Sequence, residues 1–270
     1  MPTQSSIARA LIACAFSLAA APSFAQYRPG PAATTSPAEN YHVELSAGFW
    51  APTANMQIAD GSFGTSIDLK NDLGLQDRKF PEFQIVIKPA LKHKFRVQFI
   101  PISFAQTGTP THDLVFNGQI YPAGTTITST LDWKAWRFGY EYDMVSTYRG
   151  FLGVIVDLKY TDVGATLNAA GRTGVAAAKA PIPALGGIGR LYLAQNLSFT
   201  FELTGFDLPG NWIKTTSGHY ADLDTYAMLN FTDSFGVTGG YRKFDVAYTL
   251  ASDSGTFKLD GWYVGAALRF

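Results

Sequence analysis

The sequence predicts an all-β chain that forms a transmembrane, up-and-down antiparallel β-barrel. Three observations favour this fold class. Apolar and polar residues alternate with a period of two, no segment has the pattern or length of a membrane-spanning helix, and short and long connections alternate. Charged residues are only 16% of the chain, against about 25% in ordinary soluble domains.

Ten alternating segments give the predicted number of strands, with eight strands as the alternative. The clearest is Leu197–Thr204, where Leu197, Phe199, Phe201 and Leu203 share one face and polar residues share the other. The ten segments lie near residues 41–51, 80–89, 94–104, 130–144, 150–162, 182–193, 197–207, 219–231, 235–249 and 257–270.

The N-terminus has the pattern of a secretory signal peptide, predicted over residues 1–25. Arg9 provides the positive charge, a short apolar stretch follows, and Ser23-Phe24-Ala25 forms a cleavage site before Gln26. Residues 26–40 contain three prolines and predict a flexible periplasmic lead-in, so the barrel would comprise residues 41–270. Lipidation of Cys14 is the less favoured alternative, because the apolar stretch continues beyond this residue.

The connections between the segments predict how the barrel is oriented. Short turns are expected near residues 90–93, 145–149, 194–196 and 232–234. Long loops are expected at 52–79, 105–129, 163–181 and 208–218, with a shorter fifth at 250–256. Short periplasmic turns and long extracellular loops are typical of transmembrane barrels. A soluble β-sandwich would also alternate, but the signal peptide and the many charges on the polar face argue against it.

The C-terminal segment, residues 261–270, resembles the last strand of Gram-negative outer-membrane β-barrel proteins. Trp262, Leu268 and the terminal Phe270 fit the aromatic and apolar positions that the barrel-assembly machinery reads in that class. The resemblance covers the whole chain at the level of class and implies the bacterial outer membrane as location. Ten strands is also the size of omptins, but their catalytic acid and histidine pattern does not map onto this sequence.

The polar face of the segments would line the barrel lumen with equal numbers of acids and bases. The predicted acids are Glu44, Glu82, Glu141, Asp143, Asp157, Glu202, Asp222 and Asp224. The predicted bases are Lys88, Lys94, Arg96, Arg137, Lys159, Arg190, Arg242 and Arg269. Because charges removed from water must be paired, a cross-linked interior is expected, with a narrow polar channel as the alternative.

One pair within this set can be predicted from the chain register. A tight turn at Phe231–Phe235 places residue 224 opposite residue 242. An Asp224–Arg242 ion pair is therefore expected, with Asp222 diagonally within reach of the same guanidinium.

No catalytic residue, cofactor site or metal site is predicted. His219 lies near Asp222 and Asp224 in the sequence, but structural pairing of these carboxylates with arginines explains them without catalysis. Balanced charge argues against nucleic acid as a partner, and one cysteine excludes a disulfide framework.

The predicted function is a non-enzymatic, monomeric barrel with a structural or surface-interaction role carried by long loops. The alternatives are a narrow channel for small solutes and, third, a lipid- or peptide-acting hydrolase. Outer-membrane lipid, lipopolysaccharide and the barrel-assembly machinery are the expected partners.

Overall fold

The computed structural model describes residues 39–60, 65–169, 171–213, 216–250 and 253–270. The predicted signal peptide and residues 26–38 of the predicted lead-in lie outside the described residues. Among the residues described, no helix is long and apolar enough to cross a membrane.

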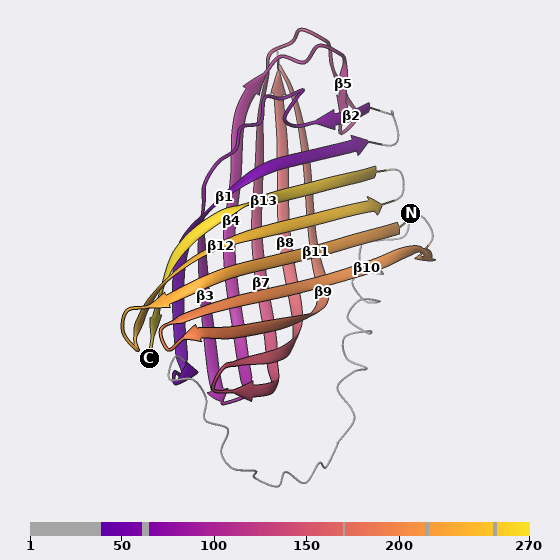
Figure 1. The fold of residues 1–270 in the computed structure, drawn as a ribbon. Coiled ribbons are helices and arrows are strands. Elements are labelled where there is room, and N and C mark those ends of the chain that lie inside the picture. The colour runs from indigo at the N-terminus through magenta and orange to yellow at the C-terminus, as the bar shows by residue number, and fades with distance from the viewer. Residues whose placement is uncertain (1–38, 61–64, 170, 214–215, 251–252) are drawn as a thin grey trace. The chain divides into compact units, whose positions relative to one another are not determined.

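Ten antiparallel strands form a ring that closes between its last and first members, as the sequence predicts (Figure 1). Their bounds are β1 (Val43–Asp60), β3 (Phe80–Ala90), β4 (His93–Gly108), β7 (Ile127–Thr147), β8 (Gly150–Ala169), β9 (Arg172–Ala194), β10 (Leu197–Ile213), β11 (Thr216–Asn230), β12 (Phe235–Leu250) and β13 (Asp253–Arg269). The short β2 (Thr65–Asp68) pairs with β1, and β5 (Leu114–Phe116) pairs with β6 (Gln119–Tyr121) in a separate hairpin.

Side chains alternate between the lumen and the outer surface, which carries a belt of exposed apolar residues. On β10, Phe199, Phe201 and Leu203 are 44%, 47% and 47% exposed, whereas Thr200 and Glu202 between them are buried. The same alternation on the other strands is why the period-two pattern of the sequence is so regular.

The ring is complete only over part of its height, and this part defines the membrane span. Within the described residues, β9 and β10 pair from Ala194–Leu197 to Leu185–Gly205, and β3 pairs with β1 as far as Trp50–Phe80. Because unpaired backbone groups are too costly in hydrocarbon, the membrane interior must coincide with the closed part. The closed stretch Leu197–Gly205 has the length that a tilted strand needs, about 9–11 residues.

Two prolines explain why the β9–β10 ladder ends where it does. Tyr192 donates its backbone N–H to the Arg149 carbonyl on the β8 side, at 2.9 Å. Since N–H groups alternate along a strand, odd-numbered residues of β9 turn their nitrogens towards β10. Pro181 and Pro183 are odd-numbered and have no N–H, so two successive donors are missing directly beyond Leu185.

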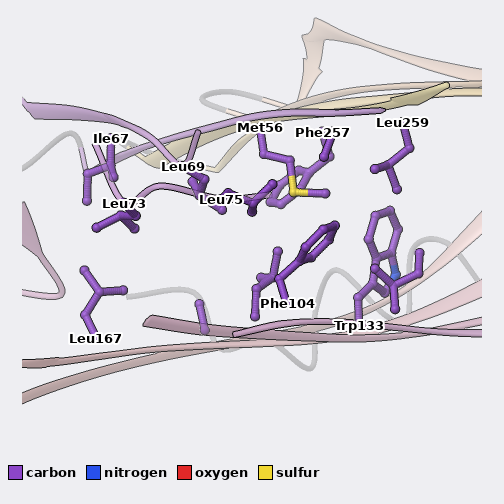
Figure 2. Close-up of a cluster of buried hydrophobic side chains, with 14 of the residues drawn as sticks. Met56, Ile67, Leu69, Leu73, Leu75, Phe104, Trp133, Leu167, Phe257 and Leu259 are labelled. Carbon is purple, nitrogen blue, oxygen red and sulfur yellow. The ribbon is translucent and has the colours of Figure 1, made fainter. Parts of the chain in front are cut away.

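Beyond the closed ring the strands separate into two sheets, one of β10–β13, β1 and β2 and the other of β4 and β7–β9 (Figure 1). A cluster of buried apolar side chains fills the space between the two sheets. In Figure 2, Met56, Phe257 and Leu259 project from one sheet towards Phe104 and Trp133 of the other. We call this part of the protein the outer sandwich, because the short turns at the opposite end mark the periplasmic side.

The outer sandwich contradicts the prediction of loops at three of the five expected positions, which are residues 163–181, 208–218 and the shorter 250–256. The described residues of these three ranges lie in paired strands, with β8 and β9 paired as far as Ala169–Arg172, β10 and β11 as far as Ile213–Thr216, and β12 and β13 as far as Leu250–Asp253. The alternation was missed in 163–181 because small residues such as Ala165 and Ala169 give little contrast between the two faces, although both are buried. The longer described connections at the outer end are residues 65–79, which include β2, and 109–126, which include the β5–β6 hairpin.

The β5–β6 hairpin packs on the apolar cluster. Asn117 and Gly118 form its two-residue turn with positive φ values of 48° and 73°, as an Asn-Gly hairpin turn requires. Tyr121 is fully buried and donates its hydroxyl proton to the Leu167 carbonyl at 3.0 Å. Burial raises the pKa of the Tyr121 phenol, which keeps it in the donating form.

The boundary between the closed ring and the outer sandwich predicts a contrast between two arginine substitutions. Phe201→Arg in the belt should cost about 2–4 kcal/mol of unfolding free energy, because the charge enters hydrocarbon. Val175→Arg is the matched control, since Val175 is 54% exposed on β9 beyond the closed ring, and it should cost at most about 1 kcal/mol. Urea titration of protein folded in lipid vesicles measures both, and equal costs would contradict the assigned membrane boundary.

Candidate functional site: the charged lumen

The lumen changes from charged to apolar along single strands. On β4 the inward positions carry Lys94, Arg96 and Gln98 towards the periplasmic end and then Ile100, Ile102 and Phe104 towards the outer end. All six side chains are buried. The charged side chains of the closed ring therefore lie directly beneath the apolar cluster of the outer sandwich.

The charged side chains form one continuous chain of ion pairs across the lumen. Lys94 Nζ lies 2.8 Å from Glu141 Oε1 and 3.0 Å from Asp143 Oδ2. Glu141 also binds Arg96, whose Nη1 lies 2.6 Å from Glu202 Oε2. Lys94 and Arg96 thus contact the neighbouring strand β7, and Arg96 also joins β4 to β10, which is not its neighbour in the ring.

The chain of ion pairs continues from Glu202 towards the opposite wall. Glu202 also binds Arg137, whose Nε lies 2.8 Å from Asp157. Lys159 lies 3.7 Å from Asp157 and 2.6 Å from Asp222. Each of these groups is buried and contacts at least one opposite charge, as removal from water requires.

Arg242 follows in the chain, where its Nη1 lies 3.5 Å from Glu82, and it forms a different close pair from the one predicted. Asp224 and Arg242 are direct cross-strand partners, so the predicted register is confirmed. The predicted Asp224–Arg242 ion pair is wrong. Arg242 instead donates from Nε and Nη2 to both oxygens of Asp222, at 2.9 and 2.8 Å, while Asp224 accepts from the Tyr263 hydroxyl at 2.8 Å. Arg242 pairs with the diagonal Asp222 because the two form a bidentate pair, in which two parallel N–H groups bind the two carboxylate oxygens.

A separate pair lies near the C-terminus. Arg269 on β13 donates from Nε to Glu44 on β1 at 2.6 Å and from Nη1 to Asn230 at 2.8 Å. Glu44 and Arg269 face each other across the β1–β13 seam. This pair therefore bridges the two strands that close the ring.

The sequence interpretation missed one member of the network, Glu39. Its carboxylate is buried in the lumen and lies 2.8 Å from Arg190 Nη1 and 3.1 Å from Lys88 Nζ. The alternation of inward and outward residues could not place Glu39 in the lumen, because this residue precedes the first strand.

The predicted site residues lie as follows. Nine of the ten lumen residues are buried (Glu44, Arg96, Arg137, Asp157, Arg190, Glu202, Asp222, Arg242 and Arg269), and Asp224 is partly buried. The three residues of the predicted assembly signal lie on the outer surface, where Trp262 is 72%, Leu268 47% and Phe270 68% exposed.

Little free space remains between these side chains. The closed ring contains a cavity of about 50 Å³ bordered by Glu82, Asp224 and Tyr263. A second cavity of about 20 Å³ lies in the apolar cluster beside Leu73 and Leu167. Cavities of this size hold one or a few water molecules.

The histidine and carboxylates that the sequence places close together are separated. Asp222 is committed to Arg242 and Lys159, whereas His219 is exposed and lies 3.9 Å from Asp207. Within the described part of the chain, no group of three or more metal-ligating side chains could hold an ion.

Comparisons with known proteins identify the fold. No family model matches the sequence, and neither does any curated protein. The outer membrane protease OmpT of Escherichia coli is similar in structure, with a TM-score of 0.56 and 8% identity over 85% of this chain and 97% of OmpT. The attachment invasion locus protein Ail of Yersinia pestis (TM-score 0.37, 9% identity, 85% and 99% covered) and the toluene transporter TodX of Pseudomonas putida (0.35, 9%, 85% and 90%) also match.

The closed ten-stranded ring, its apolar belt and the likeness to OmpT define the class of protein. The chain has the fold of Gram-negative outer-membrane β-barrels, as the C-terminal segment predicts, and its location is the bacterial outer membrane. Identities near 8% show the fold alone, so function has to be argued from the site.

The network predicts unequal effects of two isosteric substitutions on neighbouring inward positions. Asp222→Asn should lower the unfolding free energy by about 3–5 kcal/mol, because it leaves Arg242 and Lys159 with too little negative charge. Asp224→Asn should cost only about 0.5–1.5 kcal/mol, because it weakens one bond from Tyr263. Urea titration in vesicles measures both. A larger loss for Asp224→Asn would show that the pairing described above is wrong.

Proposed function

We propose that the protein is a closed, non-conducting outer-membrane barrel that presents its outer sandwich as a rigid interaction surface. The observation that carries this proposal is the filling of the lumen at two successive levels. Buried ion pairs fill the closed ring, and buried apolar side chains fill the space beyond it. A solute would have to displace both layers to cross.

The two layers oppose conduction for different physical reasons. Opening the ionic layer would separate charges such as Arg96 and Glu202, which are 2.6 Å apart and buried. Opening the apolar layer would expose side chains such as Phe104 and Trp133, which are 0% and 5% exposed, to water. A narrow channel is the alternative function predicted from the sequence. It would require an open path through both the ionic layer and the apolar layer.

The outer sandwich is suited to binding because paired strands hold its surface in place. Its outer face carries opposite charges in pairs, with Lys179 3.0 Å from Asp162 and Lys258 3.2 Å from Asp245. A mixed, balanced surface of this kind favours a protein or lipopolysaccharide partner over nucleic acid. Specificity would then reside on strands rather than on long loops.

We also propose that the chain is not an enzyme, although OmpT is named as a protease. This proposal is supported by the commitment of Asp222 to two cations and by the exposure of the His219–Asp207 pair. If His219→Ala abolished hydrolysis of a peptide or lipid by purified protein, the proposal would be wrong.

Conductance tests the closed lumen. Purified protein inserted into planar bilayers should give no steady, porin-sized current. The double variant Arg96→Ala, Arg137→Ala, which removes two cations of the ionic layer, should also remain closed, because the apolar layer above is intact. A steady current from the unmodified protein would favour the channel instead.

The exposed C-terminal ring tests the assembly role proposed for Phe270. Its backbone N–H donates to Val43 at 2.9 Å and its carbonyl accepts from His42 at 2.7 Å, so deleting the residue would also weaken barrel closure. Phe270→Ala keeps these bonds and removes only the ring. This variant should fold normally in detergent but assemble more slowly with purified assembly machinery in vesicles. Equal assembly rates would exclude recognition of this ring.

A further inference from the structure

The periplasmic end of the lumen holds one carboxylate in a dense set of donors. Glu39 Oε1 accepts from Arg190 Nη1 at 2.8 Å and from the Tyr192 hydroxyl at 2.5 Å. Glu39 Oε2 accepts from Lys88 Nζ at 3.1 Å, and Lys94 Nζ lies 3.6 Å away. Three cations and a phenol therefore converge on a single carboxylate.

Two of these cations depend on Glu39 alone. Lys94 also contacts Glu141 and Asp143, but Lys88 and Arg190 have no other carboxylate within 4.0 Å among the described residues. Both side chains are buried, with exposures of 4% and 5%. Without Glu39, the ring would contain two buried cations with no adjacent counter-ion, which strongly favours binding of another anion.

The surroundings of the three cations are preorganised. Arg190 is fixed by Thr200 and Tyr226, which accept from Nε and Nη2 at 2.8 Å each. The Phe151 ring lies 3.6 Å from Lys94 Nζ, and the Tyr41 ring lies 5.1 Å from Lys88 Nζ. Aromatic walls exclude water, and a carboxylate is attracted more strongly where water is excluded.

Glu39 differs from every other member of the network in one respect. The other charged members lie on strands of the ring, whereas Glu39 precedes β1. Pairing with the ring begins at His42, whose N–H donates to the Phe270 carbonyl at 2.7 Å. Withdrawal of Glu39 would break its side-chain contacts and the 2.6 Å bond from Lys88 Nζ to its backbone carbonyl, but would leave the β1–β13 ladder intact.

We propose that Lys88, Lys94, Arg190 and Tyr192 form a carboxylate-binding site at the periplasmic mouth, with Glu39 as its exchangeable resident ligand. A periplasmic molecule that carries a carboxylate group binds the same donors when Glu39 withdraws.

Chemical rescue tests the site in the folded protein. Glu39→Ala removes the resident carboxylate, and propionate should restore the thermal unfolding midpoint in a saturable way. About 2–4 °C is expected at about five times the dissociation constant. Sodium chloride at equal ionic strength and neutral propionamide are the controls and should give no saturable shift. Rescue should also be absent in Glu39→Gln, which refills the space without charge, and in Glu39→Ala, Arg190→Gln.

A second variant keeps the proposal testable if Glu39→Ala does not fold. Glu39→Cys, carried on a chain in which Cys14 is also replaced, should react with an anionic thiosulfonate reagent about tenfold faster than with a cationic one, because the site concentrates anions. The proposal is overturned if propionate gives no saturable rescue, if the controls rescue equally, or if the two thiosulfonates react at equal rates.

Discussion

Glu202 on β10 binds Arg96 of β4 and Arg137 of β7, which are not neighbours of β10 in the ring. A backbone ladder joins each strand only to its neighbours, so these ion pairs are what connect opposite walls of the closed ring. Because each charge is buried, removal of one member leaves its partner uncompensated. The ionic layer of the lumen depends on this mutual neutralisation, and the continuous chain from Lys94 to Arg242 extends it across the ring.

The membrane explains why charge and apolar packing occupy different heights. Within the bilayer the outer surface must be apolar and the ladder complete, so polar side chains can only face inward. Beyond the bilayer the ladder between β9 and β10 can end, and Pro181 and Pro183 end it. The separated sheets must then bury their inner faces against each other, which requires side chains such as Phe104 and Leu259.

The two proposed binding regions lie at opposite ends of the barrel. The outer sandwich offers a surface that paired strands hold rigid, whereas the periplasmic mouth offers donors held around Glu39. The ion pairs and the apolar cluster lie between the two ends. On the proposed function, such a barrel would bind partners on either side of the membrane without providing a path between the two sides.

The sequence by itself determined the ten strands, the outward and inward faces of the closed ring, the short turns and the opposition of Asp224 and Arg242. These features follow from local alternation and from turn geometry, which are readable along the chain. Only the tertiary structure decided which charges pair, because long side chains such as Arg242 choose among carboxylates from several strands. It also decided that residues 163–181 form paired strands beyond the membrane and that Glu39 enters the lumen. In these segments small residues or the absence of a strand remove the contrast between faces, and contacts distant in sequence fix the outcome.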